Sequence, residues 1–421
     1  MPPVLHPPVR RLHAVRRLPV QIAEARRALP RNVRALSWVS FANDAASELA
    51  YPVVPLFLTV TLGAPVAAVG LIEGVAEGIA VGLRGASGWL SDRWGERRLP
   101  WVTGGYAGSA AGRVVVAAAP AWGWVLFGRV VDRLGKGART APRDALIRDS
   151  TPAPLLGAAF GYHRALDTAG AVVGPLIAAG LLAAGLSFRS VLWFAVGPGI
   201  VALLLLRAVR EAPRAEAAPA AAPADPGPLP RSFWVATGIW VVFSLGNSSD
   251  VFLLLRSKEL GLGTTLVVLA YAFYNVVYSG LSWPLGALSD RRRRELLLGG
   301  GLLVFGLVYL GFAVASASWA VWPLFAVYGS YVAATDGVAR AWVADQVPGR
   351  AIGTAYGIFS AATGGALLIA SITAGLLWSH VSPAAPFVLG ASGAALALVL
   401  LVLSASTQGR ASTSPDAPPP P

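Results

Sequence analysis

Two pairs of carboxylates lie at helical spacing inside long apolar stretches. Asp44 and Glu48 are four residues apart in FANDAASELAYPVVP, and Glu73 and Glu77 have the same spacing in GLIEGVAEGIAVG. Residues four apart share one face of a helix. Burial raises the pKa of a carboxyl group and a nearby cation lowers it, so a carboxyl that alternates between two such environments takes up and releases protons. These residues are therefore candidates for proton transfer.

A dense group of ionisable residues occupies positions 129–178, between two strongly apolar flanks. Arg129 and Arg133 share a helical face, because they are four residues apart. Asp167 follows His163 at the same spacing, and we favour Asp167 as the titrating member of that pair. Together with the two carboxylate pairs, Arg129, Arg133 and Asp167 make up the predicted proton-coupling or substrate cavity.

A structural interpretation stays open for each acidic position. An ionised side chain at the centre of a bilayer costs roughly 2.5–3.5 kcal/mol on insertion scales, so each carboxylate needs water, a proton or a cationic partner. Permanent ion pairs with Arg113 or Arg129 would satisfy that need and would only hold helices together.

Other polar residues lie in the second half of the chain. Asn247 and Asp250 are weaker candidates for substrate contact, and Asp336 with Arg340, four residues apart, predicts a structural or gating ion pair. Tyrosines in positions 264–287 can stack on an organic ligand, but they are more typical of packing, and we assign them no site.

The elements that position these residues are membrane spans. Hydrophobic residues make up 55% of the chain and charged residues 13%, which is typical of integral membrane proteins. Apolar runs of about 20 residues, enough to cross the hydrocarbon core, recur through the sequence. They predict twelve helices at roughly 36–60, 65–87, 99–118, 122–141, 157–184, 188–207, 232–255, 264–287, 296–316, 319–342, 351–378 and 384–405.

The chain has a net charge of +13, which in a soluble protein would suggest nucleic-acid binding. Here the basic residues follow the alternating pattern that sets the topology of membrane proteins. Basic residues gather in the N-terminal arm and in alternate loops, whereas the opposite loops hold little beyond Arg189, Arg256 and Lys258. The positive-inside rule then places both termini in the cytoplasm, in a multi-pass protein of the cell membrane. The basic arm has two open interpretations, a contact with anionic lipid headgroups or a solvated arm that only sets topology.

The chain divides into five parts by composition. We expect a basic cytoplasmic arm over 1–34, an N-terminal six-helix bundle over 35–207, and a C-terminal six-helix bundle over 232–405. A Pro/Ala-rich cytoplasmic linker at 208–231 joins the bundles, and a disordered tail occupies 406–421. Matching segments support two related halves, since GWLSDRWGERR at 88–98 pairs with GALSDRRRRE at 286–295.

At these segments the chain resembles the major facilitator superfamily. The family's loop G-x-L-[SA]-D-R-x-G-x-R-R is matched at Gly88, Asp92 and Arg93, and a degenerate second copy includes Asp290 and Arg291. The resemblance implies an all-α membrane fold of twelve transmembrane helices, arranged as two pseudo-symmetric six-helix bundles. It also implies that the loop residues help to gate the cytoplasmic side; the alternative is that the arginines only fix topology.

A second resemblance concerns the fifth span. Gly170 and Gly174 are four residues apart, a spacing that lets helix backbones approach closely, and Pro175 removes one helical hydrogen bond. The segment resembles the family's G-x-x-x-G-P motif, which implies antiport or export, although generic helix packing explains the same residues. In the fourth span Arg133 fits the family's R-x-x-Q-G-x-G motif loosely, with Lys136 at the Gln position.

The sequence therefore predicts a secondary transporter that exports a small organic compound in exchange for protons by alternating access. An uptake permease or uniporter on the same fold and a non-transporting receptor or scaffold are the alternatives. Without cysteine there is no thiolate metal site, and no phosphate-binding or catalytic motif is present. We expect no enzymatic activity, no cofactor beyond the proton gradient, no nucleic-acid partner, and a monomer.

Overall fold

The computed structural model describes residues 29–93, 98–152, 155–211, 228–289, 293–348 and 351–411. These residues form twelve long helical segments, two of which are interrupted. The elements are α2 (Arg31–Ala50), α3 (Val54–Leu56), η1 (Phe57–Thr61), α4 (Val66–Arg93), α5 (Leu99–Ala118), α6 (Trp122–Asp149), α7 (Leu156–Ala183), α8 (Phe188–Leu206), α9 (Arg231–Gly246), α10 (Val251–Glu259), α11 (Thr264–Ser289), α12 (Arg294–Val314), η3 (Ser318–Ala320), α13 (Val321–Asp345), α14 (Ile352–His380) and α15 (Ala385–Ala411).

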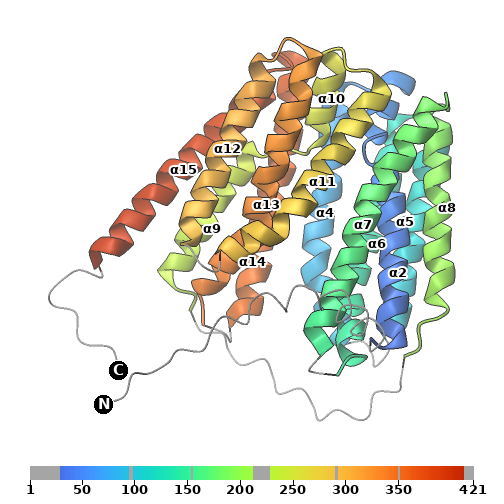
Figure 1. Cartoon of the computed structure of the whole chain (residues 1–421), viewed down its shortest axis with the longest axis horizontal. Coiled ribbons are helices and arrows are strands. Elements are labelled where there is room, and N and C mark those ends of the chain that lie inside the picture. The colour runs from blue at the N-terminus through green and yellow to red at the C-terminus, as the bar shows by residue number, and fades with distance from the viewer. Residues whose placement is uncertain are drawn as a thin grey trace, which may run out of the picture.

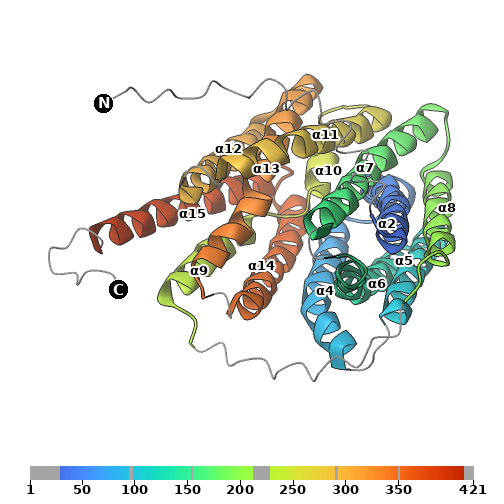
Figure 2. The same ribbon diagram turned by 60° about the horizontal axis from the view of Figure 1, so that its bottom comes forward.

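The helices form two bundles, as Figure 1 shows: α2 to α8 make up the first and α9 to α15 the second. Within the first, α2 packs on α7 and α5 on α6; within the second, α11 packs on α13 and α12 on α15. Across the bundles α4 packs on α14 and α7 on α11 (Figure 2). The predicted all-α architecture of two six-helix bundles is confirmed.

The two ends of the molecule differ in their turns. We call the end where α2 and α9 begin, at Arg31 and Arg231, the base. The other end, the top, carries Gly63, Gly185 and Gly261, each with a positive φ in a turn between helices. Glycine adopts this conformation without steric cost.

The first and seventh spans are broken, where the sequence predicted continuous helices over 36–60 and 232–255. Helix α2 ends at Ala50, and Pro52, which has no N–H to donate, lies in the turn before α3 and the π-helical η1. Helix α9 ends at Gly246, and α10 begins at Val251. Both bundles therefore have an interrupted first helix, a feature that places irregular backbone at cavity walls in membrane carriers.

Glycines fix the rotation of α6 about its own axis. A Cβ at Gly105 of α5 would lie 2.6 Å from the carbonyl oxygen of Gly135, and one at Gly128 of α6 would lie 2.7 Å from that of Gly112. The two backbones are therefore in direct contact, which only small residues permit. Helix α6 also packs on α4, and this packing directs Arg129 toward α4.

The same kind of contact joins α7 to α2. A Cβ at Gly170 would lie 2.5 Å from the carbonyl oxygen of Phe41, and one at Gly174 would lie 2.6 Å from that of Ala45. Helix α7 continues through Pro175. The close approach brings Asp167 to the same region as Asp44 of α2.

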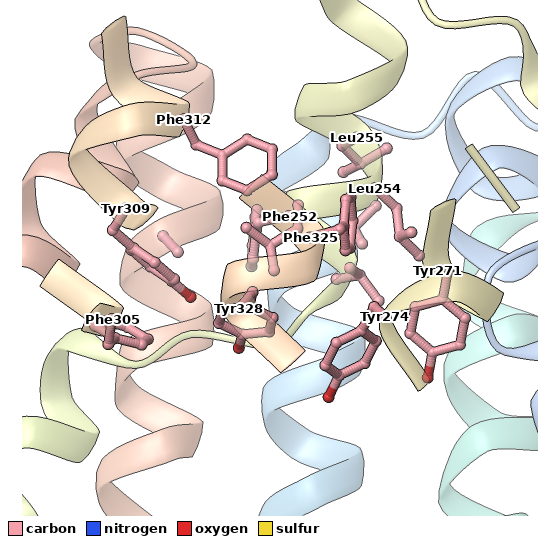
Figure 3. Packing of buried hydrophobic residues seen from close by; sticks show 14 of the residues in the cluster. Phe252, Leu254, Leu255, Tyr271, Tyr274, Phe305, Tyr309, Phe312, Phe325 and Tyr328 are labelled. Atoms are coloured by element: carbon pink, nitrogen blue, oxygen red, sulfur yellow. The ribbon is translucent and has the colours of Figure 1, made fainter. Parts of the chain in front are cut away.

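The bundles meet at the top. A Cβ at Gly375 of α14 would lie 3.0 Å from the Cα of Ala67 at the start of α4, and the Ala67 N–H donates to the Ser379 hydroxyl at 3.0 Å. In the second bundle, buried aromatic rings that include Phe252, Phe312 and Phe325 pack together (Figure 3).

Hydropathy separates two kinds of helix. Among the described residues, α7, α8, α9 with α10, α11, α12, α14 and α15 contain spans long and apolar enough to cross a membrane by length and composition. The remaining long helices are α2, α4, α5, α6 and α13, and they carry most of the ionisable residues at the candidate site. The polar residues of these five helices turn inward. On α8, α12 and α15, large apolar side chains such as Phe194, Leu307 and Leu396 are exposed on the outside.

Adding one methyl group tests the α2–α7 contact. We expect Gly174→Ala to lower the stability by about 1–3 kcal/mol, because the contact has no room for a Cβ. Gly180→Ala on the same helix is the control, since its Cβ would meet nothing within 4 Å. The measurement is the apparent unfolding temperature in detergent, and equal temperatures for the two variants would contradict the close contact.

Candidate functional site

A cavity of about 180 Å³ lies in the first bundle, between α2, α4, α5 and α6, with Tyr271 of α11 closing it from the second bundle. Its walls carry an unusual concentration of charge for a membrane protein interior. The ionisable residues that line it are Asp44, Glu48, Glu77, Arg113, Arg129, Asp132, Arg133, Lys136 and Arg139.

Two parallel ion pairs connect α4 to α6. Arg129 Nη2 lies 2.6 Å from Glu73 Oε1, and Arg133 Nη2 lies 2.9 Å from Glu77 Oε1. The four-residue spacing on each helix produces this ladder. The side chain of Glu73 is only 2% exposed, whereas that of Glu77 is 29% exposed and faces the cavity. Glu73 thus has the geometry of the structural ion pair that the sequence left open.

Arg113 connects α5 to α2 and α6. Its Nη2 donates to Asn43 Oδ1 at 2.7 Å and to the Ser47 hydroxyl at 2.8 Å, and lies 3.8 Å from Asp132 Oδ1. The sequence suggested Arg113 as a partner for the carboxylate pairs, but its closest contacts are neutral side chains of α2. The guanidinium is therefore compensated by hydrogen bonds and by Asp132.

Glu48 is the exception in this network. Its Oε2 accepts a hydrogen bond of 2.9 Å from the hydroxyl of Tyr271, which belongs to the other bundle. Among the described residues, no Arg, Lys or His nitrogen forms an ion pair with it within 4.0 Å. A cavity-lining carboxyl without a fixed cation can exchange a proton without breaking an ion pair.

Asp44 and Asp167 lie next to each other, on α2 and α7. Asp44 lines the cavity and is close enough to share a hydrogen bond with Asp167 when one of the two is protonated. Asp167 also accepts from the Ser40 hydroxyl at 2.6 Å and lies 3.4 Å from Arg164 Nη1. The ring nitrogens of buried His163 have no hydrogen-bond partner in the described part of the chain, so Ser40 and Arg164, not His163, hold Asp167.

A second cavity of about 410 Å³ lies against the second bundle, and Glu77 of α4 lines both cavities. Asp250, in the break before α10, accepts from the hydroxyls of Tyr328 at 2.7 Å and Tyr274 at 3.3 Å. Nearer the base, Arg340 Nη2 lies 3.4 Å from Asp336 Oδ1, so the predicted pair forms.

Sequence reasoning missed the tyrosines of the site. Tyr271, Tyr274 and Tyr278 are spaced by three and four residues on α11, and each donates to a carboxylate: Glu48, Asp250 and Asp336, respectively. Figure 3 shows the hydroxyl ends of Tyr271, Tyr274 and Tyr328 pointing to the side away from Phe312. The available signal was this one-face spacing, which resembles ordinary helix packing when no partner is known.

The gating-loop residues are only partly visible. The backbone of Gly88, Asp92 and Arg93 lies in the last turns of α4, which extends beyond the predicted end of the span at 87. Their side chains, and all of Asp290 and Arg291, lie outside the described residues. So do positions 1–28 of the arm, 212–227 of the linker and 412–421 of the tail.

Comparison with known proteins decides the family. The family model described as Major Facilitator Superfamily matches residues 36–335 and 241–420. The chain belongs to the major facilitator superfamily (MFS). An uncharacterized MFS-type transporter of Methanocaldococcus jannaschii is 34% identical over 384 residues, which cover 89% of this chain and 95% of that protein. An uncharacterized protein of Mycobacterium tuberculosis is 32% identical over 73% of this chain and 77% of its own length.

Solved structures agree on the MFS fold. The POT family transporter PepTSo superposes with a TM-score of 0.73 at 12% identity, covering 90% of this chain and 99% of that one. A bacterial homologue of the human lysosomal transporter Spinster, in an inward-facing and unoccupied conformation, gives a TM-score of 0.68 at 18% identity, covering 89% and 95%. At these identities the likeness concerns the fold. Membership of the MFS makes the chain a multi-pass membrane transporter of a small molecule.

Neutralising Glu73 tests the buried ion pair. We expect Glu73→Gln and Arg129→Gln each to destabilise the protein by about 3–5 kcal/mol, because each leaves one buried charge unpaired. The double variant should lose less than the sum of the two, since it leaves no charge behind. Denaturant midpoints in detergent provide the measurement.

The control for this pair is Glu259→Gln, whose partner Arg256 lies 3.0 Å away and whose own side chain is 41% exposed. Because Glu259 is exposed and Arg256 also donates to backbone carbonyls, losing this pair should cost only about 0–1 kcal/mol. Additive losses at Glu73 and Arg129 would show that the two charges do not depend on each other.

Proposed function

We propose that this protein exports a small organic compound in exchange for protons, by alternating access of a central site between its two bundles. The observation that carries the proposal is Glu48: a cavity carboxyl with no cationic partner among the described residues, hydrogen-bonded across the bundle interface to Tyr271. Protonation at this position and the relative position of the bundles therefore depend on the same contact.

The contacts between the bundles support coupling. Besides Tyr271 with Glu48, the Ser249 hydroxyl lies 3.5 Å from Glu73 Oε2 and 3.3 Å from the Tyr51 hydroxyl. Rocking one bundle against the other breaks all of these contacts, because each has one partner in each bundle. Glu48 would then exchange its tyrosine for water, and this exchange is the change of environment that alters a carboxyl's proton affinity.

The arrangement of the two bundles favours access to the central site from the base. The bundles are in contact at the top, and the second cavity reaches Arg340, whose side chain is 61% exposed, on the base side. Arginines at the base include Arg31, Arg207 and Arg231, whereas the top holds Arg189 and Arg256. By the positive-inside rule the base would be cytoplasmic, and the second cavity would then be reached from the cytoplasm.

The small-residue segment of α7 favours export over uptake, because it resembles the family's G-x-x-x-G-P motif, which implies antiport or export. Gly170 and Gly174 press that helix against α2, next to Glu48 and Asp44 of the cavity. Uptake or uniport on the same fold is the second candidate function. Export predicts that cells lacking the protein accumulate more substrate, and uptake predicts that they accumulate less.

The surroundings of the carrier are part of the proposal. We assign it to the cell membrane as a monomer with no cofactor other than the proton gradient and no nucleic-acid partner. The gating-loop residues Asp92 and Arg93 would act at the base, where α4 ends. The basic arm would lie against anionic headgroups on the cytoplasmic surface.

Glu48→Gln tests proton exchange. Inside-out vesicles are acidified by respiration, and a pH-sensitive dye reports proton release when compounds from a panel of organic cations, anions and neutral solutes are added. We expect compounds that are exchanged for protons to dissipate the gradient only in vesicles containing the protein. With Glu48→Gln the signal should fall to the level of vesicles without the protein, because Gln carries no titratable proton.

Glu259→Gln, a matched change at the top of the molecule outside both cavities, should keep the full signal. Proteoliposomes loaded with an active compound then separate the alternatives. Flux that ignores an imposed pH gradient would remove proton coupling, and no flux for any compound would favour a receptor or scaffold.

A further inference from the structure

The second cavity has a continuous aromatic wall. Consecutive rings along it are Trp240, Phe243, Tyr331, Tyr328 and Tyr274, with centroids 5.3 to 6.0 Å apart. They come from α9, α11 and α13, three helices that are distant in sequence and adjacent in the second bundle. Aromatic faces carry negative potential and attract cations more strongly than anions.

Three carboxylates line this cavity, and two of them have a guanidinium partner. Glu77 pairs with Arg133 at 2.9 Å and Asp336 with Arg340 at 3.4 Å. Asp250 has no cation within 4.0 Å in the part of the chain that the structure describes. With Arg340 as the cavity's only basic lining residue among those described, the wall is acidic overall.

The carboxyl group of Asp250 is held by two tyrosine hydroxyls. Its two oxygens accept from different tyrosines, Oδ1 from Tyr328 and Oδ2 from Tyr274. An ionised carboxylate can accept at both oxygens, and a bound cation would favour that ionised form. The side chain makes no capping hydrogen bond to α10, although it lies at the N-cap position. The carboxyl group therefore faces the cavity without a cationic partner among the described residues.

We propose that this cavity binds an organic cation, a protonated amine or quaternary ammonium with aromatic or apolar substituents, its charge placed against Asp250 and its substituents against the tyrosine wall. This inference rests on the proposed transport function and names the substrate class. The cation supplies the partner that a buried carboxylate requires. The tyrosine hydroxyls hold the carboxylate in place, and their ring faces add cation–π attraction.

The alternatives of a metal ion or an anion fit less well. The described residues contain no group of three or more His, Cys, Asp or Glu that could hold a metal ion. A volume of about 410 Å³ exceeds that of a bare ion and is within the range of small-molecule sites. An anion would face Asp250 directly, and like-charge contacts oppose binding.

Binding of radiolabelled tetraphenylphosphonium to the purified full-length protein in detergent tests the proposal. Two competitors share a benzyl group and differ in charge: benzyltrimethylammonium and phenylacetate. We expect the cation to displace the probe and the anion to leave it bound. Asp250→Asn should weaken probe binding by at least about tenfold, because it removes one partner of a buried charge pair.

Tyr328→Phe keeps the ring and removes the hydrogen bond to Asp250, and we expect a smaller loss than with Asp250→Asn. Asp345→Asn, a matched change on an exposed carboxylate of the same bundle that is paired with Arg294, should leave binding unchanged. Unfolding temperatures of all variants separate lost binding from lost folding. Binding of phenylacetate in place of the cation, or binding that survives in folded Asp250→Asn, would overturn the proposal.

The outcome also separates this inference from the proposed function. Displacement by the cation together with loss of binding in Asp250→Asn supports the cation site even if no compound dissipates the pH gradient in vesicles, in which case the exchange mechanism fails. Proton-coupled flux of anions with no cation binding would keep the carrier and reject the substrate class.

Discussion

The structure depends on one constraint: an ionised group in a membrane protein interior needs a partner of opposite charge, hydrogen bonds or water. Backbone contacts between glycines of α5 and α6 leave α6 one rotation, and that rotation turns Arg129 toward Glu73 and Arg133 toward Glu77. The ion pairs in turn hold α4 in place. The arrangement of the first bundle therefore depends on both helix packing and charge compensation. The close α5–α6 contact places the arginines, and the ion pairs with α4 compensate their charge.

Charge compensation is complete at some positions and incomplete at others, and the proposed function rests on this difference. Glu73 is buried against the guanidinium of Arg129. Glu48 and Asp250 are held only by tyrosine hydroxyls in the described structure. The first lies in the charged cavity of one bundle and the second in the aromatic cavity of the other. In the proposed exchange, a proton is the partner of Glu48 and an organic cation is the partner of Asp250.

Much of the fold could be predicted from the sequence, because hydropathy and repeated loops report on local segments. The four-residue spacing of Glu73 and Glu77 correctly placed both on one face of α4. Both breaks in the first helices of the bundles were missed: no proline marks the one at 247–250, and Pro52 alone did not distinguish a break from a kink in the other. The contact of Tyr271 with Glu48 joins residues 223 positions apart, and no local pattern encodes such a pair. The roles of the predicted site residues remain predictions that the proposed variants test.

Glu77 lines both cavities while its carboxylate is paired with Arg133. A positive charge entering the second cavity would compete with that guanidinium for the same carboxylate, and the released Arg133 would raise the electrostatic potential around the acidic groups of the first. A cation in the second cavity would thus alter occupancy of the first, and thermodynamic reciprocity would make the effect equal in both directions. A single side chain in the shared wall would then link the two cavities.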